Sequence, residues 1–377
     1  MQAPTACAPI GVDHGTIHVA IELSQRSWVI VMHSPDQARL SQHKLPPGGY
    51  EALLELLEKV KTRVARTTGG VPAIVSCYEA GYDGFWLHRR LEAAGIENVV
   101  IDPASLSVER RARRAKTDRI DGEKMIRALL AYRRGEPRVM SVVRVPTPEQ
   151  EDARRRTRER ERLVREQTGH VNRLRALLRT VGLATEEPGR PDWPTAWLAQ
   201  QRDWRGQPLP PLLVAELTRE HARLMVVRTQ LAELGEEALP EPTAEKAQQL
   251  MRLKGIGPVF AATLAGEVFW KDFKNRREVG SYLGLTPSPW CSGEVEHDQG
   301  ISKAGNRRGR YIAVEAAWLW LQNQPQSALS RWFQARVGEQ RGRVRRIAIV
   351  ALARKLVIAL WRFLCCGLVP DNAVLKA

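Results

Sequence analysis

The chain has 377 residues, 43% of them hydrophobic, which is enough for two or three domains with cores of their own. Its 58 Lys and Arg exceed its 42 Asp and Glu, and the net charge of +16 favours a polyanionic partner, nucleic acid before a membrane surface. Neither a long apolar run nor a signal pattern is present, and the five cysteines fit neither a disulfide framework nor a zinc site, so we expect a cytoplasmic protein without disulfides, zinc or membrane spans.

Residues 15–147 are predicted to form an α/β domain, because short β-branched strands alternate with amphipathic helices. Two strands over residues 17–32 are expected to form a hairpin that opens the sheet. The further elements expected are a helix from Tyr50, a strand in VPAIVSCYEA, a helix in FWLHRRLEAAG, a strand in IENVVIDP and a helix over residues 116–132.

Residues 148–240 are predicted to form an arm of two long helices, 148–182 and 212–235, separated by a Pro- and Trp-rich insert. The arm is either an antiparallel coiled coil that dimerises or a plain helical hairpin packed on a core. Residues 241–377 are predicted to form an all-helical domain.

A helix-hairpin-helix motif is predicted in MRLKGIGPVFAATLAGEV, where a G-I-G-P turn separates two helices. Glycines allow the backbone to approach a phosphate closely, and the N-terminus of the second helix offers amide donors. Lys254, Gly255 and Gly257 are therefore candidate phosphate contacts. An ordinary αα-hairpin is the alternative.

Four acidic residues in the first half are candidates for a metal site. Glu22 and Glu79 lie near the ends of predicted strands, and Asp118 and Asp121 lie three residues apart on one predicted helix. Carboxylates that converge need cations to neutralise them, and oxygen ligands favour Mg²⁺ or Mn²⁺. Two such ions would clamp the attacking and leaving oxygens of a phosphodiester. Ordinary solvated carboxylates paired with Arg114 or Lys124 are the alternative.

Basic residues surround the acidic pair and recur in the C-terminal half. The candidate phosphate contacts are Arg110, Arg111, Arg113, Arg114 and Lys116 beside Asp118, and Lys303, Asn306, Arg307 and Arg308 in GISKAGNRRGRY. Between them, residues 284–311 are expected to be a loop, because they are rich in Gly, Ser and Pro. Ser292 in this loop is a candidate nucleophile on phosphate, with cations nearby to stabilise the transition state.

These motifs together resemble the transposases of the insertion-sequence 110 family, also called DEDD transposases, over nearly the whole chain. The specific pair is AKTDRID with GISKAGN, and the supporting segments are CYEAGYDGFWLHRRL, VVIDPASL, LKGIGPVFAATLAGEV and SYLGLTPSPWCSG. The resemblance implies a RuvC-like (RNase H-like) N-terminal domain with four metal-binding carboxylates, a coiled-coil linker and a C-terminal domain with a catalytic serine.

Carried over by position, Glu79, Asp118 and Asp121 match the second to fourth acidic positions, and Ser292 matches the serine. Ser302 in ISKAGN is the alternative nucleophile. The first acidic position departs from the family, which usually has Asp where this chain has the longer Glu22.

The resemblance further implies DNA strand exchange through a phosphoserine link, a dimer or tetramer, and a guiding (bridge) noncoding RNA, because some relatives are RNA-guided recombinases. Two other functions remain open from the residues. One is a metal-dependent, resolvase-like structure-selective endonuclease that uses water in place of the serine. The other is a nucleic-acid-binding protein whose catalytic site has decayed.

Overall fold

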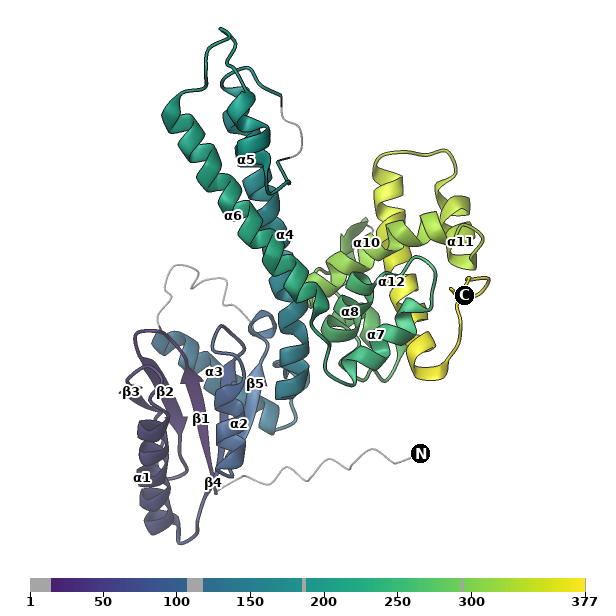
Figure 1. Cartoon of the computed structure of the whole chain (residues 1–377). Coiled ribbons are helices and arrows are strands. Elements are labelled where there is room, and N and C mark those ends of the chain that lie inside the picture. The colour runs from purple at the N-terminus through teal and green to yellow at the C-terminus, as the bar shows by residue number, and fades with distance from the viewer. Residues whose placement is uncertain (1–14, 107–117, 185–187, 293–294, 377) are drawn as a thin grey trace. The chain divides into compact units, whose positions relative to one another are not determined.

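A computed structural model of the chain describes residues 15–106, 118–184, 188–292 and 295–376. The chain divides into two compact units, Met1–Val145 and Pro146–Ala377, and each is described by itself (Figure 1). The predicted boundary at residue 240, between the arm and the helical domain, falls inside the second unit.

The first unit is built on a five-stranded mixed sheet with the strand order β3-β2-β1-β4-β5. Antiparallel pairing joins β1 to β2 and β2 to β3, whereas β1, β4 and β5 are parallel. The strands are β1 (Thr16–Glu22), β2 (Trp28–His33), β3 (Ser41–Leu45), β4 (Ala73–Glu79) and β5 (Glu97–Ile101). The predicted hairpin and parallel strands are confirmed. Strand β3 was not predicted, because its sequence SQHKL is polar and only partly buried.

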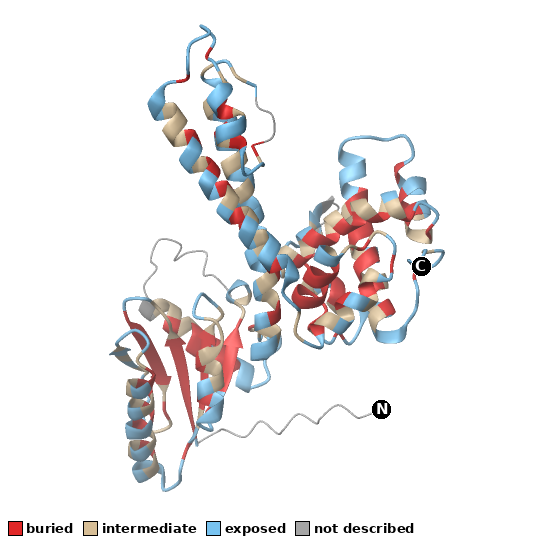
Figure 2. Ribbon diagram, viewed as in Figure 1, coloured by how far each residue is buried: buried red, intermediate tan, exposed pale blue. Residues whose placement is uncertain are grey.

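Helices cover both faces of this sheet. Helices α1 (Tyr50–Thr68) and α2 (Trp86–Ala93) pack on the face that carries Ile21. Helix α3 (Asp118–Arg133) packs on the other face, against Ala20 and Cys77. Because both faces are covered, most strand residues are buried, as the red strands of Figure 2 show. A short 3₁₀ helix, η1 (Pro103–Ser105), follows β5.

Helix α3 lies unusually close to the sheet at Gly122. A Cβ atom at this position would lie only 2.6 Å from Cγ2 of Val31 on β2. One turn further on, the backbone carbonyl of Met125 lies 4.0 Å from Sγ of Cys77 on β4. The small residue just after the first turn of α3 thus sets how closely the start of the helix approaches the sheet.

The second unit begins with an antiparallel pair of long helices, α4 (Pro148–Arg179) and α6 (Pro211–Glu236). Arg156 of α4 bonds to the carbonyl of Leu234, whereas Arg173 bonds to Glu216, so the two helices run in opposite directions. Leucines of both helices pack along the arm. The two predicted long helices are confirmed as a hairpin.

The Pro- and Trp-rich insert closes the far end of the arm. It contains α5 (Trp193–Ala196) and the 3₁₀ helix η3 (Leu198–Gln200). Trp193 is buried and stacks on His221 of α6, with ring centroids 5.4 Å apart. His221 Nε2 in turn lies 2.9 Å from the carbonyl of Arg190. The insert is therefore an ordered cap on the two helices.

The rest of the second unit is a helical core with one β-hairpin. The helices are α7 (Thr243–Met251), α8 (Pro258–Glu267), α9 (Arg276–Tyr282), α10 (Arg307–Asn323), α11 (Ala328–Val337) and α12 (Arg343–Cys366). Leu352, Leu356 and Leu360 of α12 are fully buried in this core beside Trp320. Among the helices of the described residues, none is long and apolar enough to traverse a bilayer.

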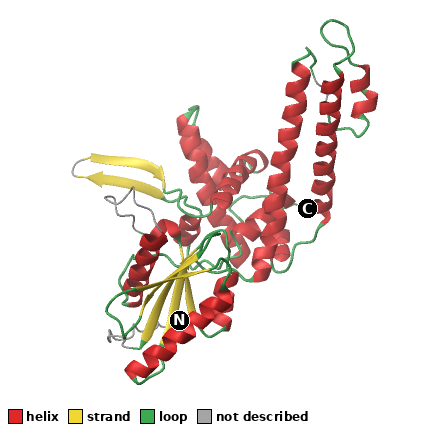
Figure 3. Ribbon diagram, turned by 90° about the vertical axis from the view of Figure 1, so that its left-hand side faces the viewer, coloured by secondary structure: helices red, strands yellow, loops and turns green. Residues whose placement is uncertain are grey.

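The loop predicted over residues 284–311 is wrong for its central part and for residues 307–311, which begin α10. Strands β6 (Pro287–Ser292) and β7 (Val295–Ile301) form an antiparallel hairpin, the yellow ribbon of Figure 3. Pro and Gly in these strands are typical of loops, but a two-stranded ribbon consists of edge strands only, where Pro is tolerated.

We expect Gly122→Ala to destabilise the chain by about 1–3 kcal/mol, because the added methyl group must displace Val31 or α3. Thermal unfolding of the full chain, followed by circular dichroism, measures this. Gly169→Ala is the control, since Gly169 is an exposed residue of α4 with open space around it, and there Ala should stabilise the helix by up to about 1 kcal/mol. Equal stability of the Gly122 variant and wild type would show that the close approach is not needed.

Candidate catalytic and nucleic-acid-binding residues

Glu22 and Glu79 lie at the same edge of the sheet. They are the last residues of β1 and β4, which pair in parallel with Ile21 opposite Tyr78, so the next residues along, Glu22 and Glu79, are level with each other. Side chains alternate between the two faces of a strand. Glu22 therefore shares the face of Ala20, and Glu79 that of Cys77, which is the face covered by α3.

The pKa of the Cys77 thiol is affected by the charge of Glu79. Burial raises the pKa of Cys77, which is completely buried, and the negative charge of Glu79 raises it further. The thiol therefore stays protonated and acts as a small apolar group beneath the carboxylate.

Asp118 and Asp121 lie in the first turn of α3. Asp118 is the first residue of the helix, and its side chain lies outside the described part of the structure. Asp121 precedes Gly122 and is mostly buried, with Oδ1 3.1 Å from Nζ of Lys124. Three of the four predicted carboxylates thus have described positions, on the end of β1, the end of β4 and the start of α3.

These carboxylates have the donor chemistry that a hard divalent cation requires. In the parts of the chain whose side chains are described, no three His, Cys, Asp or Glu residues already stand as a metal-binding group. The side chain of Asp118 is not among those residues, so the four-carboxylate site stays a prediction.

Ser292 is the last residue of β6, where the hairpin ends, and its backbone pairs with Val295. Its side chain lies outside the described residues. The alternative nucleophile, Ser302, lies at the base of the hairpin, where its Oγ accepts a hydrogen bond from Thr286 Oγ1 at 3.3 Å. The two serines therefore lie at opposite ends of one ribbon.

The base of the hairpin is fixed by close contacts between two loops. Gly284 has φ +62°, and a Cβ atom there would lie 2.2 Å from the carbonyl oxygen of Ala304. Gly305 has φ +109° and would similarly meet the carbonyl oxygen of Tyr282 at 2.3 Å. Only glycine fits both the conformation and the space, which explains physically why LGLTP and SKAGN occur together in the chain.

The segment predicted as a helix-hairpin-helix folds as α7, a turn over residues 252–257, and α8, and its assignment to that motif stays a prediction. Gly255 has φ +91° and packs against Asn323, while Gly257 directly precedes the first residue of α8. Lys254 is exposed, and its backbone is held by the carbonyl of Val374 and by the side chain of Gln324. The first-turn amides of a helix have no partners within the helix, so this turn has the donors that a phosphate needs.

Asn306 and Arg308, predicted to contact nucleic acid, take part in a buried network around Glu267 of α8. The carboxylate of Glu267, 1% exposed, lies 2.7 Å from Arg158 Nε and 3.5 Å from Arg308 Nε. Asn306 caps α10 through Gly309 N and donates to the carbonyl of Glu267 at 2.9 Å. Arg308 also pairs with Glu161 at 2.7 Å. This network ties α8 and α10 to α4.

The remaining predicted phosphate contacts divide into two sets. Lys303 and Arg307 are exposed beside the base of the hairpin. The others, Arg110, Arg111, Arg113, Arg114 and Lys116, lie outside the described residues. Sequence reasoning missed Glu267 and Arg158. Glu267 stands in an apolar helix, PVFAATLAGE, which was the available signal for a buried ion pair.

Comparison with known proteins identifies the chain. A family model named DEDD_Tnp_IS110 and described as "Transposase" matches residues 13–182, and one described as "Transposase IS116/IS110/IS902 family" matches residues 247–331. The putative transposase y4rJ of Sinorhizobium fredii is 45% identical over 390 residues, which span 100% of this chain and 98% of the relative. The transposase for insertion sequence element IS1111A of Coxiella burnetii is 27% identical, over 74% of each chain.

A mixed sheet covered by helices and followed by a helical part is compatible with the DEDD, RNase H-like fold of that family. The protein is thus a transposase, an enzyme that cuts and rejoins DNA. It belongs to the IS110 family.

The Glu267 network predicts a dependence of stability on pH. Burial alone would raise the pKa of Glu267, but the hydrogen bond and charge of Arg158 outweigh it, so the pKa lies below the usual 4.5. A lowered pKa in the folded state stabilises the protein above the unfolded value and loses this contribution as pH falls through the folded value. Glu267→Gln should therefore lower the free energy of unfolding by about 2 kcal/mol at pH 7. This is less than the loss expected for a fully buried pair, because Arg158 is half exposed.

The measurement is thermal unfolding of wild type and Glu267→Gln from pH 7 down to pH about 3. The difference between them should shrink below pH 4.5, where the carboxylate of the wild type becomes neutral. A difference that stays constant over this range would contradict the assignment.

Proposed function

We propose that the chain cuts and rejoins the DNA of an insertion sequence with Ser292 as nucleophile and with Glu22, Glu79, Asp118 and Asp121 as an acidic metal-binding set. Membership of the IS110 family supports the reaction class. The observation that best supports the acidic set is the parallel register that brings Glu22 and Glu79 level at one sheet edge. The position of Ser292 at the end of the hairpin is consistent with an accessible nucleophile.

The proposed chemistry is a reversible phosphoryl transfer. Ser292 Oγ loses its proton and forms a bond to the scissile phosphorus, and the bond from phosphorus to one deoxyribose oxygen breaks. That oxygen takes up one proton as it leaves and so becomes a hydroxyl. The phosphoserine diester keeps one ester bond for the joining step, in which a deoxyribose hydroxyl of the partner strand attacks and releases the serine. No oxidant or nucleotide is consumed.

The acidic residues would hold a divalent cation, Mg²⁺ or Mn²⁺, as DEDD transposases typically do. Such a cation, when bound, neutralises charge on the phosphate and lowers the pKa of the attacking hydroxyl. The carboxylates would hold the cation through their oxygens, and the contact with Lys124 orients one oxygen of Asp121.

DNA would be held by contacts to its backbone. The turn before α8 offers amides at the N-terminus of a helix, with Lys254 beside them. Lys303 and Arg307, exposed at the hairpin base, supply positive charge near the strand that carries Ser292. Such contacts position the duplex without reading its sequence. We further propose that a structured noncoding RNA selects the sites by base pairing, and that two or four copies of the chain act together.

Covalent capture tests this proposal. Purified protein with its co-purified RNA and Mg²⁺ is incubated with labelled DNA that carries the ends of its insertion sequence, and adducts are resolved by denaturing electrophoresis. Wild type should give a protein–DNA adduct that Ser292→Ala lacks. Ser302→Ala is the matched control and should still form the adduct.

The other outcomes separate the competing functions. Cleavage without an adduct, unaffected by Ser292→Ala, would identify a resolvase-like endonuclease that uses water. Binding without cleavage or adduct would identify a chain whose catalytic site has decayed. An adduct lost in Ser302→Ala but kept in Ser292→Ala would move the nucleophile to the base of the hairpin.

A further inference from the structure

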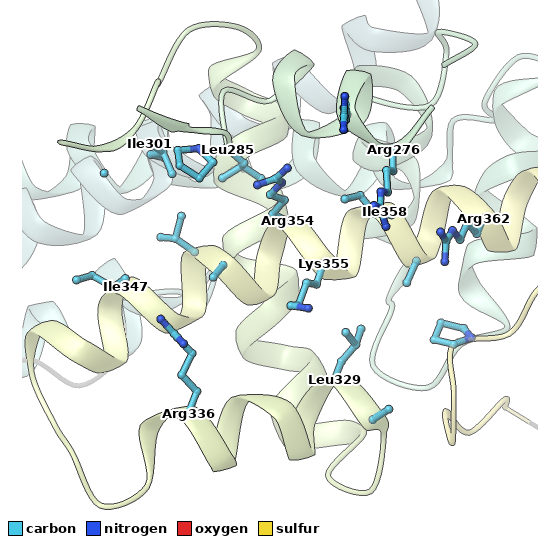
Figure 4. Close-up of a pocket in the computed structure, with 18 of the residues that line it drawn as sticks. Arg276, Leu285, Ile301, Leu329, Arg336, Ile347, Arg354, Lys355, Ile358 and Arg362 are labelled. Atoms are coloured by element: carbon cyan, nitrogen blue, oxygen red, sulfur yellow. The ribbon is translucent and has the colours of Figure 1, made fainter. Parts of the chain in front are cut away.

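A cavity of about 1250 Å³ lies in the second unit between α9, α11, α12 and the base of the hairpin (Figure 4). Cationic side chains enter it from several elements. They include Arg276 of α9, Arg336 of α11 and four residues of α12, namely Arg346, Arg354, Lys355 and Arg362. Among the described residues that line the cavity, Asp371 is the only carboxylate. The cavity is therefore strongly positive.

Several cations of this cavity have no ion-pair partner among the residues whose side chains the structure describes. Ion pairs elsewhere in the unit are numerous, including those of Arg158, Arg173 and Arg308. Within the described part of the chain, by contrast, Arg346, Arg354 and Arg362 form no ion pair. Clustered like charges repel each other and destabilise the fold, so an anionic partner would stabilise this arrangement.

The spacing along α12 indicates an extended anion. Arg346, Arg354 and Arg362 follow one another every eight residues along an i, i+4 ridge of α12, which winds around the helix by about 80° per step, and all three line the cavity. At a rise of 1.5 Å per residue, consecutive arginines are about 12 Å apart, and the row is about 24 Å long. One small phosphate or carboxylate cannot contact all three side chains. A linear polyanion can.

Apolar side chains alternate with these arginines. Val350 and Ile358 occupy the intervening positions of the same ridge and line the cavity. Ile347 and Leu368, also at the cavity, are 54% and 60% exposed. An intact duplex presents mainly phosphates and sugars to such a surface, whereas an unpaired strand also presents base faces that pack on apolar side chains.

We propose that this cavity binds an unpaired nucleic-acid strand, with its phosphates on the arginine row of α12 and its bases on the intervening aliphatic side chains. The inference rests on the proposed function for the identity of the polyanion. Its source is an unpaired segment of RNA or a DNA strand freed from its duplex, which share this chemistry.

The cavity is continuous with the ribbon that carries Ser292. Pro287 and Ile301, which pair at the base of the hairpin, line the cavity. Ser292 is five residues further along β6, so at about 3.4 Å per residue it lies about 17 Å away along the strand. A strand held on α12 would thus be anchored at the base of the ribbon whose end carries the proposed nucleophile.

Binding of oligonucleotides to the full chain tests the inference without Mg²⁺ and independently of catalysis. The full-length Ser292→Ala variant is first freed of co-purified RNA. It is then titrated with labelled single-stranded DNA, single-stranded RNA and duplex DNA of one length, at several salt concentrations. The test variant is Arg346→Gln with Arg362→Gln, both exposed. The control, Arg219→Gln with Arg331→Gln, removes the same charge from exposed positions outside the cavity.

We expect the test pair to weaken single-strand binding on the order of tenfold for each lost contact. The slope of log affinity against log salt should fall by about 1.4, since each phosphate contact on a single strand contributes about 0.7. Ile347→Ser should weaken single-strand binding at unchanged slope. A preference for the ribo- or the deoxyribo-oligonucleotide would assign the source.

Three results would overturn the inference: equal losses in the test and control pairs, duplex binding as tight as single-strand binding, or no effect of Ile347→Ser. The covalent-capture experiment with Ser292→Ala tests the nucleophile only. If no adduct forms but the oligonucleotide binding is as expected, the proposed chemistry is refuted and the assignment of the cavity is kept.

Discussion

The parallel pairing of β1 with β4 is the constraint on which the first unit depends. It aligns the carboxyl ends of two strands that are 57 residues apart in sequence, so that Glu22 and Glu79 end level on the face covered by α3. Gly122 lets the first turn of α3, with Asp118 and Asp121, approach that face closely. The positions of the acidic residues thus depend on the backbone pairing of β1 with β4 and on the absence of a side chain at Gly122.

In the second unit, a buried carboxylate holds together elements that are distant in the sequence. Glu267 gathers Arg158 from α4 and Asn306 and Arg308 from the start of α10. The same segment holds the loop of Gly305 against that of Gly284, from which the hairpin leaves the helical core. The position of Ser292 is therefore fixed from its base by buried polar contacts and close backbone packing. Polar groups without partners there would be costly.

The alternation of apolar residues was sufficient to predict most strands and helices of the first unit. It failed for β3, whose side chains are polar, and for the hairpin, whose Pro and Gly content is typical of loops. Asn306 and Arg308 were predicted as phosphate contacts from the basic segment in which they stand, GISKAGNRRGRY. The sequence does not show that a residue distant along the chain, Glu267, contacts both of them.

The arginine row of α12 was available in the sequence but was not recognised. Its spacing of eight residues places Arg346, Arg354 and Arg362 along one ridge that winds around the helix, and an apolar helix with scattered cations is also typical of a core helix with a solvated side. Only the packing of α9, α11 and the hairpin base around this ridge makes it part of a cavity. The arginines can be read from the sequence, whereas the cavity around them depends on how the other elements pack against α12.

The acidic edge of the sheet at Glu79 is proposed to bind a divalent cation. Calorimetric titration of the full chain with Mn²⁺ tests it most directly, with Glu79→Gln compared with Glu97→Gln. Glu97 begins β5 at the opposite edge and forms a half-exposed ion pair with Arg133, so it is a matched control. We expect Glu79→Gln to weaken Mn²⁺ binding on the order of tenfold or more, and Glu97→Gln to bind like wild type. Wild-type affinity in Glu79→Gln would contradict it.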